Sequence, residues 1–169
     1  SKPTLAADPI GATDYSVDIV PPTLERAELD LNLNKVALTF SEAVVLGTFS
    51  SDQVSIQSLV NDNTESHTLA GGATSVGIAT DGSASAFIVV IDLEDADVEA
   101  LKLSSTLAID KDSTFVTIPA GVIQDVAEND AVAKKPSAAL KVAEYTKDAN
   151  APSLTSFTLD MTEGSLLLT

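Results

Sequence analysis

The sequence predicts an all-β fold, a β-sandwich with one short helix, repeated in a tandem array. Two observations carry this prediction. Short segments in which apolar and polar residues alternate are separated by clusters of turn-forming residues. In addition, the stretch from Tyr15 to Thr39 recurs at Tyr145 to Thr169, at a constant offset of 130 positions and without a gap.

Composition excludes several classes of function. The chain of 169 residues has 25 Asp and Glu against nine Lys and Arg, a formal charge of −16. Nucleic acid is therefore not an expected partner, because phosphate is bound by cationic surfaces. Hydrophobic residues make up 44% of the chain, which is not the composition of a disordered acidic protein. With no cysteine, disulfides, thiolate zinc sites and cysteine nucleophiles are excluded.

Membrane insertion is not expected either. The longest apolar run, Ala86 to Ile91, is far shorter than the roughly 20 residues that span a bilayer.

The first predicted element is a hairpin. Apolar residues alternate with polar ones from Ala27 to Leu31 and again from Val36 to Phe40. The residues between them, 32–35, align with Thr162-Glu163-Gly164-Ser165 of the second copy, which is a turn sequence. Leu33 is therefore expected in the turn although it is apolar.

Further strands are expected along the chain, and one helix. The expected strands are Gln53 to Leu59, Ser66 to Ala70, Ala86 to Asp92, Thr114 to Ile118 and Ala138 to Tyr145. The strand at Ala86 to Asp92 is apolar on both faces, which predicts a central position. A short helix is expected from Ala96 to Lys102, capped by Asp95, with Val98 and Leu101 facing the core. About seven short strands and one helical turn favour an immunoglobulin-like sandwich.

The repeat predicts the organisation of the chain. Between the two copies, the identical pairs are Tyr15/Tyr145, Asp18/Asp148, Pro22/Pro152, Leu24/Leu154, Leu29/Leu159, Asp30/Asp160, Leu38/Leu168 and Thr39/Thr169. Residues 19–148 are expected to form one complete repeat, residues 1–18 the C-terminal strand of a preceding repeat, and residues 149–169 the first strands of a following one. A period this long suits separate globular domains rather than a solenoid.

Two segments resemble a known family. Pro22-Thr23-Leu24 followed by Val36 to Val44 is similar to the opening of bacterial-type Ig-like tandem repeats, and Ile123 to Asp130 resembles their late Asp-x-Ala-Gly-Asn segment, with Glu128 in place of the usual Gly. His67 to Gly72 and Val98 to Lys102 fit longer versions of these repeats in large algal and other protist surface proteins. The resemblance implies an Ig-like module of a large extracellular protein, such as an adhesin, a cell-wall protein or a flagellar-hair filament.

Calcium is the one cofactor that the sequence suggests. Tandem extracellular domains often hold an ion between carboxylates at their junctions, and calcium takes oxygen ligands. The candidate ligands are Asp148 and Asn150 at the second junction, and Asp125 and Asn129 in an acidic loop that an Ig-like pairing would bring near Glu42. The alternative is that the junction residues cap turns and the prolines stiffen the linker.

Other acidic and basic groups favour structural roles. The acidic segment from Asp92 to Glu99 reads as the solvated start of a helix. The single histidine, His67, is expected on the surface of a strand, and no nucleophile elbow occurs, so no enzyme is expected. From Val36 to Leu101 there is no Lys or Arg, whereas Lys102 to Lys147 is rich in Lys, a distribution that suits head-to-tail stacking or cation bridging between neighbours.

The sequence thus predicts a structural or adhesive repeat of an extracellular surface or filament protein. Its expected partners are neighbouring repeats in a homo-polymeric or filament assembly, with a glycan as a further candidate. Its architectural residues are expected to be Tyr15, Asp18, Pro22, Tyr145, Asp148 and Pro152. The alternative is a carbohydrate-binding or accessory Ig-like module of a secreted enzyme.

Overall fold

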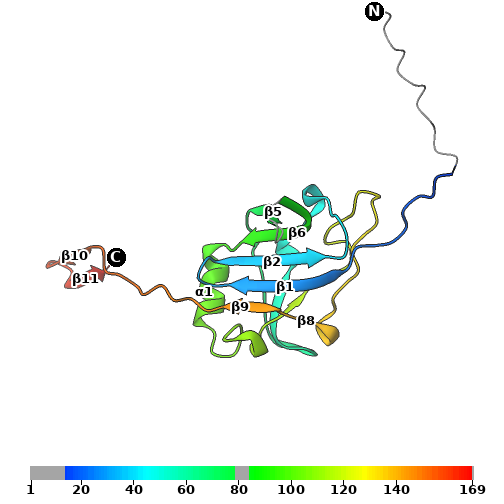
Figure 1. Cartoon of the computed structure of the whole chain (residues 1–169). Helices are drawn as coiled ribbons and strands as arrows, with labels where there is room; N and C mark the ends of the chain where they lie inside the picture. Colours follow the sequence, from blue (N-terminus) through cyan, green and yellow to red (C-terminus); the bar gives the residue numbers. More distant parts are fainter. Residues whose placement is uncertain (1–13, 79–83, 169) are drawn as a thin grey trace, which may run out of the picture.

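The computed structural model describes residues 14–78 and 84–168, and most of its regular elements are strands (Figure 1). The strands are β1 (Leu24–Asp30), β2 (Lys35–Phe40), β3 (Ser55–Leu59), β4 (Asp62–Thr68), β5 (Thr74–Ile78), β6 (Ala84–Asp92), β7 (Phe115–Thr117), β8 (Leu140–Lys141), β9 (Glu144–Thr146), β10 (Phe157–Asp160) and β11 (Ser165–Leu168). The helices are α1 (Asp95–Leu103) and the 3₁₀ turns η1 (Leu46–Thr48), η2 (Ser51–Gln53), η3 (Lys111–Ser113) and η4 (Pro136–Ala138).

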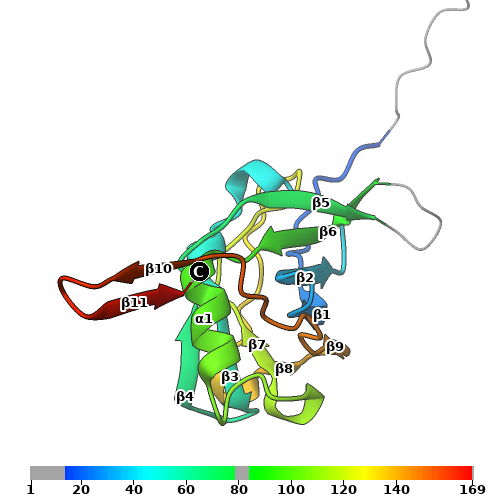
Figure 2. The same ribbon diagram turned by 90° about the vertical axis from the view of Figure 1, so that its left-hand side faces the viewer.

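Two sheets build the main body. One has the strand order β5-β6-β2-β1-β9 and the other the order β4-β3-β7-β8. Figure 2 shows them as separate layers, with α1 lying across one end of both. The hairpin β10–β11 stands apart from this body and pairs with neither sheet. The observed architecture is thus a mostly β fold with two packed sheets, as predicted.

The first hairpin forms as the alternation predicts. β1 and β2 pair antiparallel, with Leu29 opposite Val36. Asp30 ends β1, and its Oδ1 accepts the backbone N–H groups of Asn32 and Leu33, both at 2.8 Å. Leu33 lies in the turn and its side chain is 62% exposed, so the prediction from the aligned copy is confirmed.

The last predicted strand is wrong in one respect, because it is two strands in different sheets. β8 pairs with β7, whereas β9 pairs parallel with β1. Between them, Val142 donates its N–H to the carbonyl of Thr114 at 3.1 Å, and Ala143 donates to that of Ala27 at 2.7 Å. The chain therefore crosses from one sheet to the other without a turn residue, and the sequence alternation does not register the change.

Three other elements also differ from the sequence prediction. β4 begins at Asp62, four residues earlier than predicted. β5, in the glycine-rich segment that follows His67, was not predicted, because the alternation there is weak; it pairs with β6. The helix begins at Asp95 itself, after Glu94, and no side chain caps it. Val98 and Leu101 do pack against the core, as expected.

The core lies between the two sheets and is aliphatic. β6 is central, between β5 and β2, and buries Val89 and Ile91; Phe87, on the same strand, is 46% exposed. The largest fully buried side chains are Phe40, Leu24, Leu29, Leu38, Ile56, Leu69, Ile91, Leu101 and Ile123. Burial of this kind stabilises a fold by roughly 1.5–3 kcal/mol for each large side chain. The unit therefore has a core of its own that needs no residue of β10–β11.

No helix among the described residues has the length and apolarity that crossing a membrane requires.

Candidate functional site

The candidate site comprises the two linkers, at opposite ends of the main body. The chain enters β1 at one end of the sheet and leaves β9 at the other, as Figure 1 shows. The parallel pairing of these strands places their C-terminal ends side by side, with Asp30 opposite Thr146. The linker before β1 and the linker after β9 therefore leave the main body at opposite ends.

Tyr145 anchors the end of the unit. Its ring packs against the core, and its hydroxyl donates to the carbonyl of Ala108 at 2.7 Å. Burial, and then the nearby Asp110 carboxylate, raises the pKa of Tyr145 above its usual value. Tyr15, its counterpart in the first copy, is 81% exposed.

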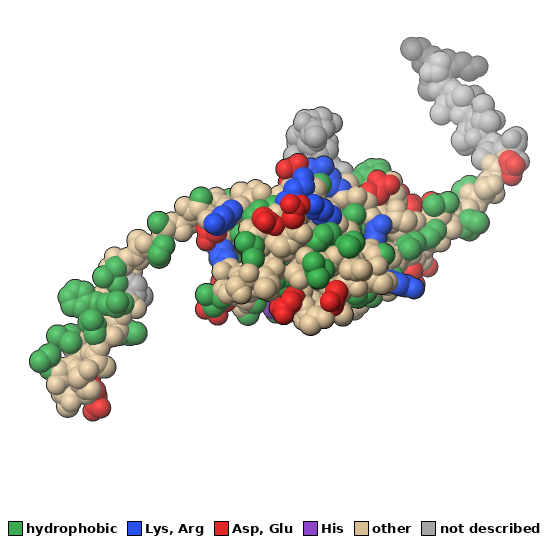
Figure 3. Space-filling model, turned by 90° about the horizontal axis from the view of Figure 1, so that it is seen from below, with side chains coloured by type: hydrophobic (Ala, Val, Ile, Leu, Met, Phe, Trp, Pro, Cys, Tyr) green, Lys and Arg blue, Asp and Glu red, His purple; other side chains and the backbone are tan. Residues whose placement is uncertain are grey.

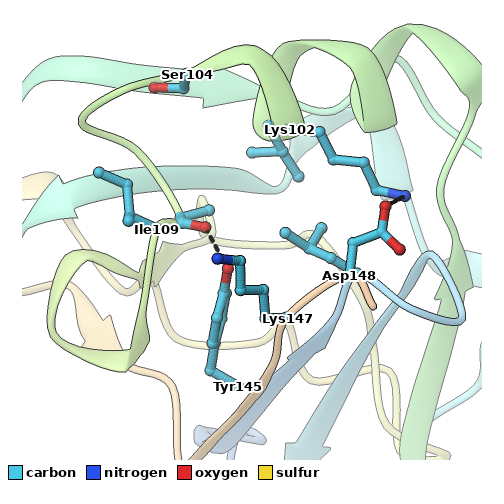
Figure 4. Close-up of a pocket in the computed structure, with 9 residues that line it drawn as sticks. Lys102, Ser104, Ile109, Tyr145, Lys147 and Asp148 are labelled. Carbon is cyan, nitrogen blue, oxygen red and sulfur yellow. Dashed lines mark hydrogen bonds and ion pairs between the residues drawn. The ribbon is translucent and has the colours of Figure 1, made fainter. Parts of the chain in front are cut away.

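Asp148 lies beside this tyrosine and is held by a lysine of α1 (Figure 4). Lys102 Nζ lies 2.8 Å from Asp148 Oδ2, and both side chains are about three-quarters covered. Asp148 Oδ1 also accepts the N–H of Asn150 at 2.9 Å. The hydrogen bond from Lys102, followed by that from Asn150, lowers the pKa of the Asp148 carboxyl.

The following linker residues are tied back to the β1–β2 turn. Ala149 donates its N–H to Asn32 Oδ1, and the side-chain amide of Asn150 donates to the carbonyl of Asn32, both at 3.2 Å. The side-chain nitrogen of Asn150 thus faces Asn32, and the ammonium group of Lys102 contacts the Asp148 carboxylate. Lys102 and Tyr145 also line a hollow of about 290 Å³ beside the linker.

At the other end, the first linker is held by an asparagine. The side-chain amide of Asn129 lies 3.3 Å from the carbonyl of Asp18 and 3.4 Å from that of Val20. Asp18 Oδ1 accepts the N–H of Val20 at 3.0 Å. Pro22 is buried, and its carbonyl accepts the N–H of Val132 at 2.9 Å. Pro152, the counterpart of Pro22, is exposed.

Three carboxylates converge beside this linker. One oxygen from each of Asp18, Glu42 and Asp125 lies within 4.8 Å of the others, at a hollow of about 410 Å³. Sequence reasoning placed Glu42 near Asp125, and this is confirmed; it missed Asp18 as a member of the group. We call these three residues the carboxylate cluster.

The members of the carboxylate cluster differ in their electrostatics. Burial, followed by the charges of Asp18 and Asp125, raises the pKa of Glu42. Burial also disfavours the charged form of Asp125, but hydrogen bonds from the Asn129 side chain and backbone outweigh it and lower that pKa. Asn129 Nδ2 lies 2.8 Å from Asp125 Oδ2, so its amide nitrogen faces the carboxylate. A cation beside Glu42 would favour its charged form.

Glu128, in the Asp125–Asn129 loop, occupies a left-handed backbone position. Its φ is 67°, a value that glycine adopts without steric cost. The turn forms here with glutamate, and Glu128 donates its N–H to the carbonyl of Asp125 at 3.3 Å.

A second ionisable pair was missed by the sequence analysis. Asp97 in α1 is fully buried, not solvated as expected, and its Oδ1 accepts the N–H of Ala70 at 2.9 Å. His67 Nε2 lies 2.8 Å from the same oxygen, and the histidine side chain is 26% exposed rather than on the open surface. The pair ties α1 to β4. Its residues are 30 positions apart, and nothing in the local pattern signals their contact.

The hairpin β10–β11 exposes apolar side chains (Figure 3). These are Phe157, Leu159, Met161, Leu166, Leu167 and Leu168, each at least 55% exposed. The first-copy counterparts of Leu159, Leu166 and Leu168 are buried.

Comparisons with known proteins find similarity to solved structures only. Neither family models nor curated proteins give a match. The structure of domains 1–6 of the surface layer protein SbsC aligns with 89% of this chain and 18% of its own, at 14% identity and a TM-score of 0.45. The N-terminal part of the bacterial S-layer protein SbsC aligns with 89% of this chain and 31% of its own, at 18% identity and a TM-score of 0.41. The crystal structure of a longer SbsC chain aligns with 84% of this chain at 15% identity and a TM-score of 0.43. This chain covers only 15% of that longer chain.

Proposed function

We propose that residues 19–148 are one unit of a tandem array in an extracellular surface or filament protein, with a structural and spacing role. The observation that carries the proposal is the repeated hairpin. After a shift of 130 positions, β10–β11 has the register of β1–β2, with Leu159 opposite Leu166 as Leu29 is opposite Val36. A sequence repeat that also repeats the pairing is what a second copy of the unit would begin with.

Turn geometry supports the same reading. Asp160 Oδ1 accepts the N–H groups of Thr162 and Glu163 at 2.8 and 3.0 Å, the contacts that Asp30 makes in the first turn. The left-handed residue of each turn also falls at the same place, Asn34 with φ 56° and Gly164 with φ 64°.

The mechanism is mechanical. Each unit has its own core, and its linkers leave at opposite ends, so that units joined in series form an extended chain. The oxygens of Asn32 accept hydrogen bonds from the second linker, and the Asn129 side chain donates to the first; the buried Pro22 limits backbone freedom. The residues proposed to be architectural are Tyr15, Asp18, Pro22, Tyr145, Asp148 and Pro152.

Sequencing the transcript on both sides of the region that encodes this chain tests the array. Three or more copies of the Tyr145–Thr169 pattern at a spacing close to 130 residues are expected. A catalytic domain directly after Thr169 would overturn the proposal and favour an accessory module of a secreted enzyme.

Antibodies against the unit test the proposed location. We expect them to label intact cells as strongly as permeabilised cells. Labelling that requires permeabilisation would contradict a surface location.

Calcium at the junctions stays a prediction of the sequence. The candidate ligands there are Asp148 and Asn150, or Asp125 and Asn129, the last two lying beside Asp18 and Glu42. Melting the chain with added calcium and with a chelator tests it. A melting midpoint that is the same with calcium and with the chelator would contradict calcium binding.

A further inference from the structure

The two linkers show the two halves of one junction. Asp18 and Asp148 are equivalent at the offset of 130, and each accepts the N–H of the residue two positions later, at 3.0 Å in Val20 and 2.9 Å in Asn150. Around Asp148 the structure shows how the preceding unit holds the linker. Around Asp18 it shows how the following unit does so.

On the preceding side, a cation contacts the linker aspartate. Lys102 Nζ lies 2.8 Å from Asp148 Oδ2, and the pair is only about a quarter exposed (Figure 4). Oδ1 of Asp148 is taken by the Asn150 N–H, so the lysine uses the oxygen that the turn leaves available.

On the following side, two further carboxylates lie close to the carboxylate of the linker aspartate. Glu42 and Asp125 each place an oxygen within 4.8 Å of Asp18. Within residues 14–78 and 84–168, none of the ion pairs includes a member of this cluster. Three charged carboxylates this close repel one another, and a cation among them relieves that repulsion.

From these two halves we infer that Lys102 of one unit enters the carboxylate cluster of the next unit. There it contacts the linker aspartate and faces the two other carboxylates of the cluster. The inference rests on the proposed tandem array. The partner is therefore a second copy of the unit, and the contact is a lysine with three carboxylates, one from the linker and two from the following unit. One cation held by both units fixes the angle between them and takes the place that a metal ion would otherwise occupy.

The inference makes a demand on neighbouring repeats. Lys102 precedes Asp148 by 46 residues, and Glu42 follows Asp18 by 24. A preceding repeat should carry Lys or Arg 46 residues before Asp18, and a following repeat should carry an acidic residue 24 residues after Asp148.

A chain with two complete units provides the direct test. Residues 1–153 are followed by residues 24–169, so that Asp148 takes the place of Asp18, Asn150 keeps its contact with Asn32, and each unit keeps its whole core. The protein has no cysteine, so Asn61→Cys in each unit, at an exposed turn, gives two spin-label sites. Pulsed electron paramagnetic resonance then measures the distribution of distances between the units.

The parent chain is expected to give one narrow distribution in the presence of a chelator. Lys102→Met in the first unit should widen it at least twofold, whereas Lys135→Met, at an exposed lysine just before η4, should not. Glu42→Gln in the second unit should also widen it. The same change in the first unit should not, because no unit precedes that one.

Each other outcome has a distinct meaning. A narrow distribution that Lys102→Met leaves unchanged would overturn the lysine contact but leave the array proposal standing. A distribution that narrows only on adding calcium would also overturn the lysine contact, in favour of a metal ion. A broad distribution in the parent chain under every condition would overturn both the lysine contact and the proposed spacing role.

Discussion

The hairpins β1–β2 and β10–β11 have the same local structure in opposite surroundings. Their registers and turn contacts coincide after a shift of 130 positions. Leu29 and Leu38 are at most 2% exposed, whereas Leu159 and Leu168 are more than half exposed. Strand pairing and turn geometry thus follow from local sequence, whereas burial depends on strands that come later in the chain, from β3 to β9.

The largest expected effect comes from shortening one core side chain in each hairpin. Leu38→Ala should lower the free energy of unfolding by about 2–5 kcal/mol, because it leaves a cavity between the sheets. Its counterpart Leu168→Ala should change the value by less than about 0.5 kcal/mol, because the leucine is already exposed. Urea denaturation measures both. Equal losses would show that the second hairpin is part of the same cooperative core.

Removing the turn aspartates sharpens the comparison further. Asp30→Ala should cost about 1 kcal/mol, because two backbone N–H groups lose their acceptor in a turn of the folded body. Asp160→Ala should leave the unfolding midpoint unchanged and alter only the NMR signals of β10 and β11. A shift of the midpoint by Asp160→Ala would contradict the independence of the second hairpin.

The two tyrosines allow the same comparison at the junctions. The raised pKa of Tyr145 means that the folded unit holds this proton more tightly than the unfolded chain. Tyr145 therefore contributes stability below its ordinary pKa, near 10, and the contribution is lost as the pH rises through the folded value.

Ultraviolet titration measures the late ionisation of Tyr145. Tyr145→Phe should remove the component that titrates late and should cost about 1 kcal/mol for the lost hydrogen bond to Ala108. Tyr15→Phe should leave stability unchanged, because the Tyr15 side chain is 81% exposed. A titration from which Tyr145→Phe removes no late component would contradict the anchoring role of Tyr145.

The smallest expected effects concern the linker aspartates. The surroundings of Asp148 lower its own pKa, whereas the charge of Asp18 helps to raise the pKa of Glu42. Because the pKa of Asp148 is lowered, its charged form stabilises the unit above the ordinary carboxyl pKa, and this is lost as the pH falls through the folded value. Asp148→Asn should therefore reduce stability slightly at neutral pH and remove part of its acid dependence.

Asp18→Asn should act on a neighbouring carboxyl instead. Because the charge of Asp18 contributes to the raised pKa of Glu42, the substitution should lower that pKa, as NMR titration of the Glu42 side chain would show. An unchanged Glu42 titration would mean that the two carboxylates do not lie together in solution.

Local pattern predicts those parts of the fold whose determinants lie close together in sequence. Alternation predicts β1 and β2, and the aligned second copy places Leu33 in the turn. The division between β8 and β9 could not be predicted, because Val142 and Ala143 bond to opposite sheets without any turn residue. The contacts of His67 with Asp97 and of Lys102 with Asp148 could not be predicted from local pattern either. Each joins residues at least 30 positions apart.

The candidate site was predicted in part. The repeat identifies Asp18 and Asp148 as equivalent, but it does not show that one faces carboxylates and the other a lysine. That difference arises because the first is held by the unit that follows it and the second by the unit that precedes it.

Amide hydrogen exchange in the two hairpins tests the central claim most directly. In this chain the amides of Leu29 and Val36 should exchange only through global unfolding, because both strands lie within the sheet and its core. The amides of Leu159 and Leu166 should exchange many orders of magnitude faster, because no core covers their hairpin. Equal protection in the two hairpins would contradict the account that residues 19–148 fold as a unit and residues 149–169 belong to the next one.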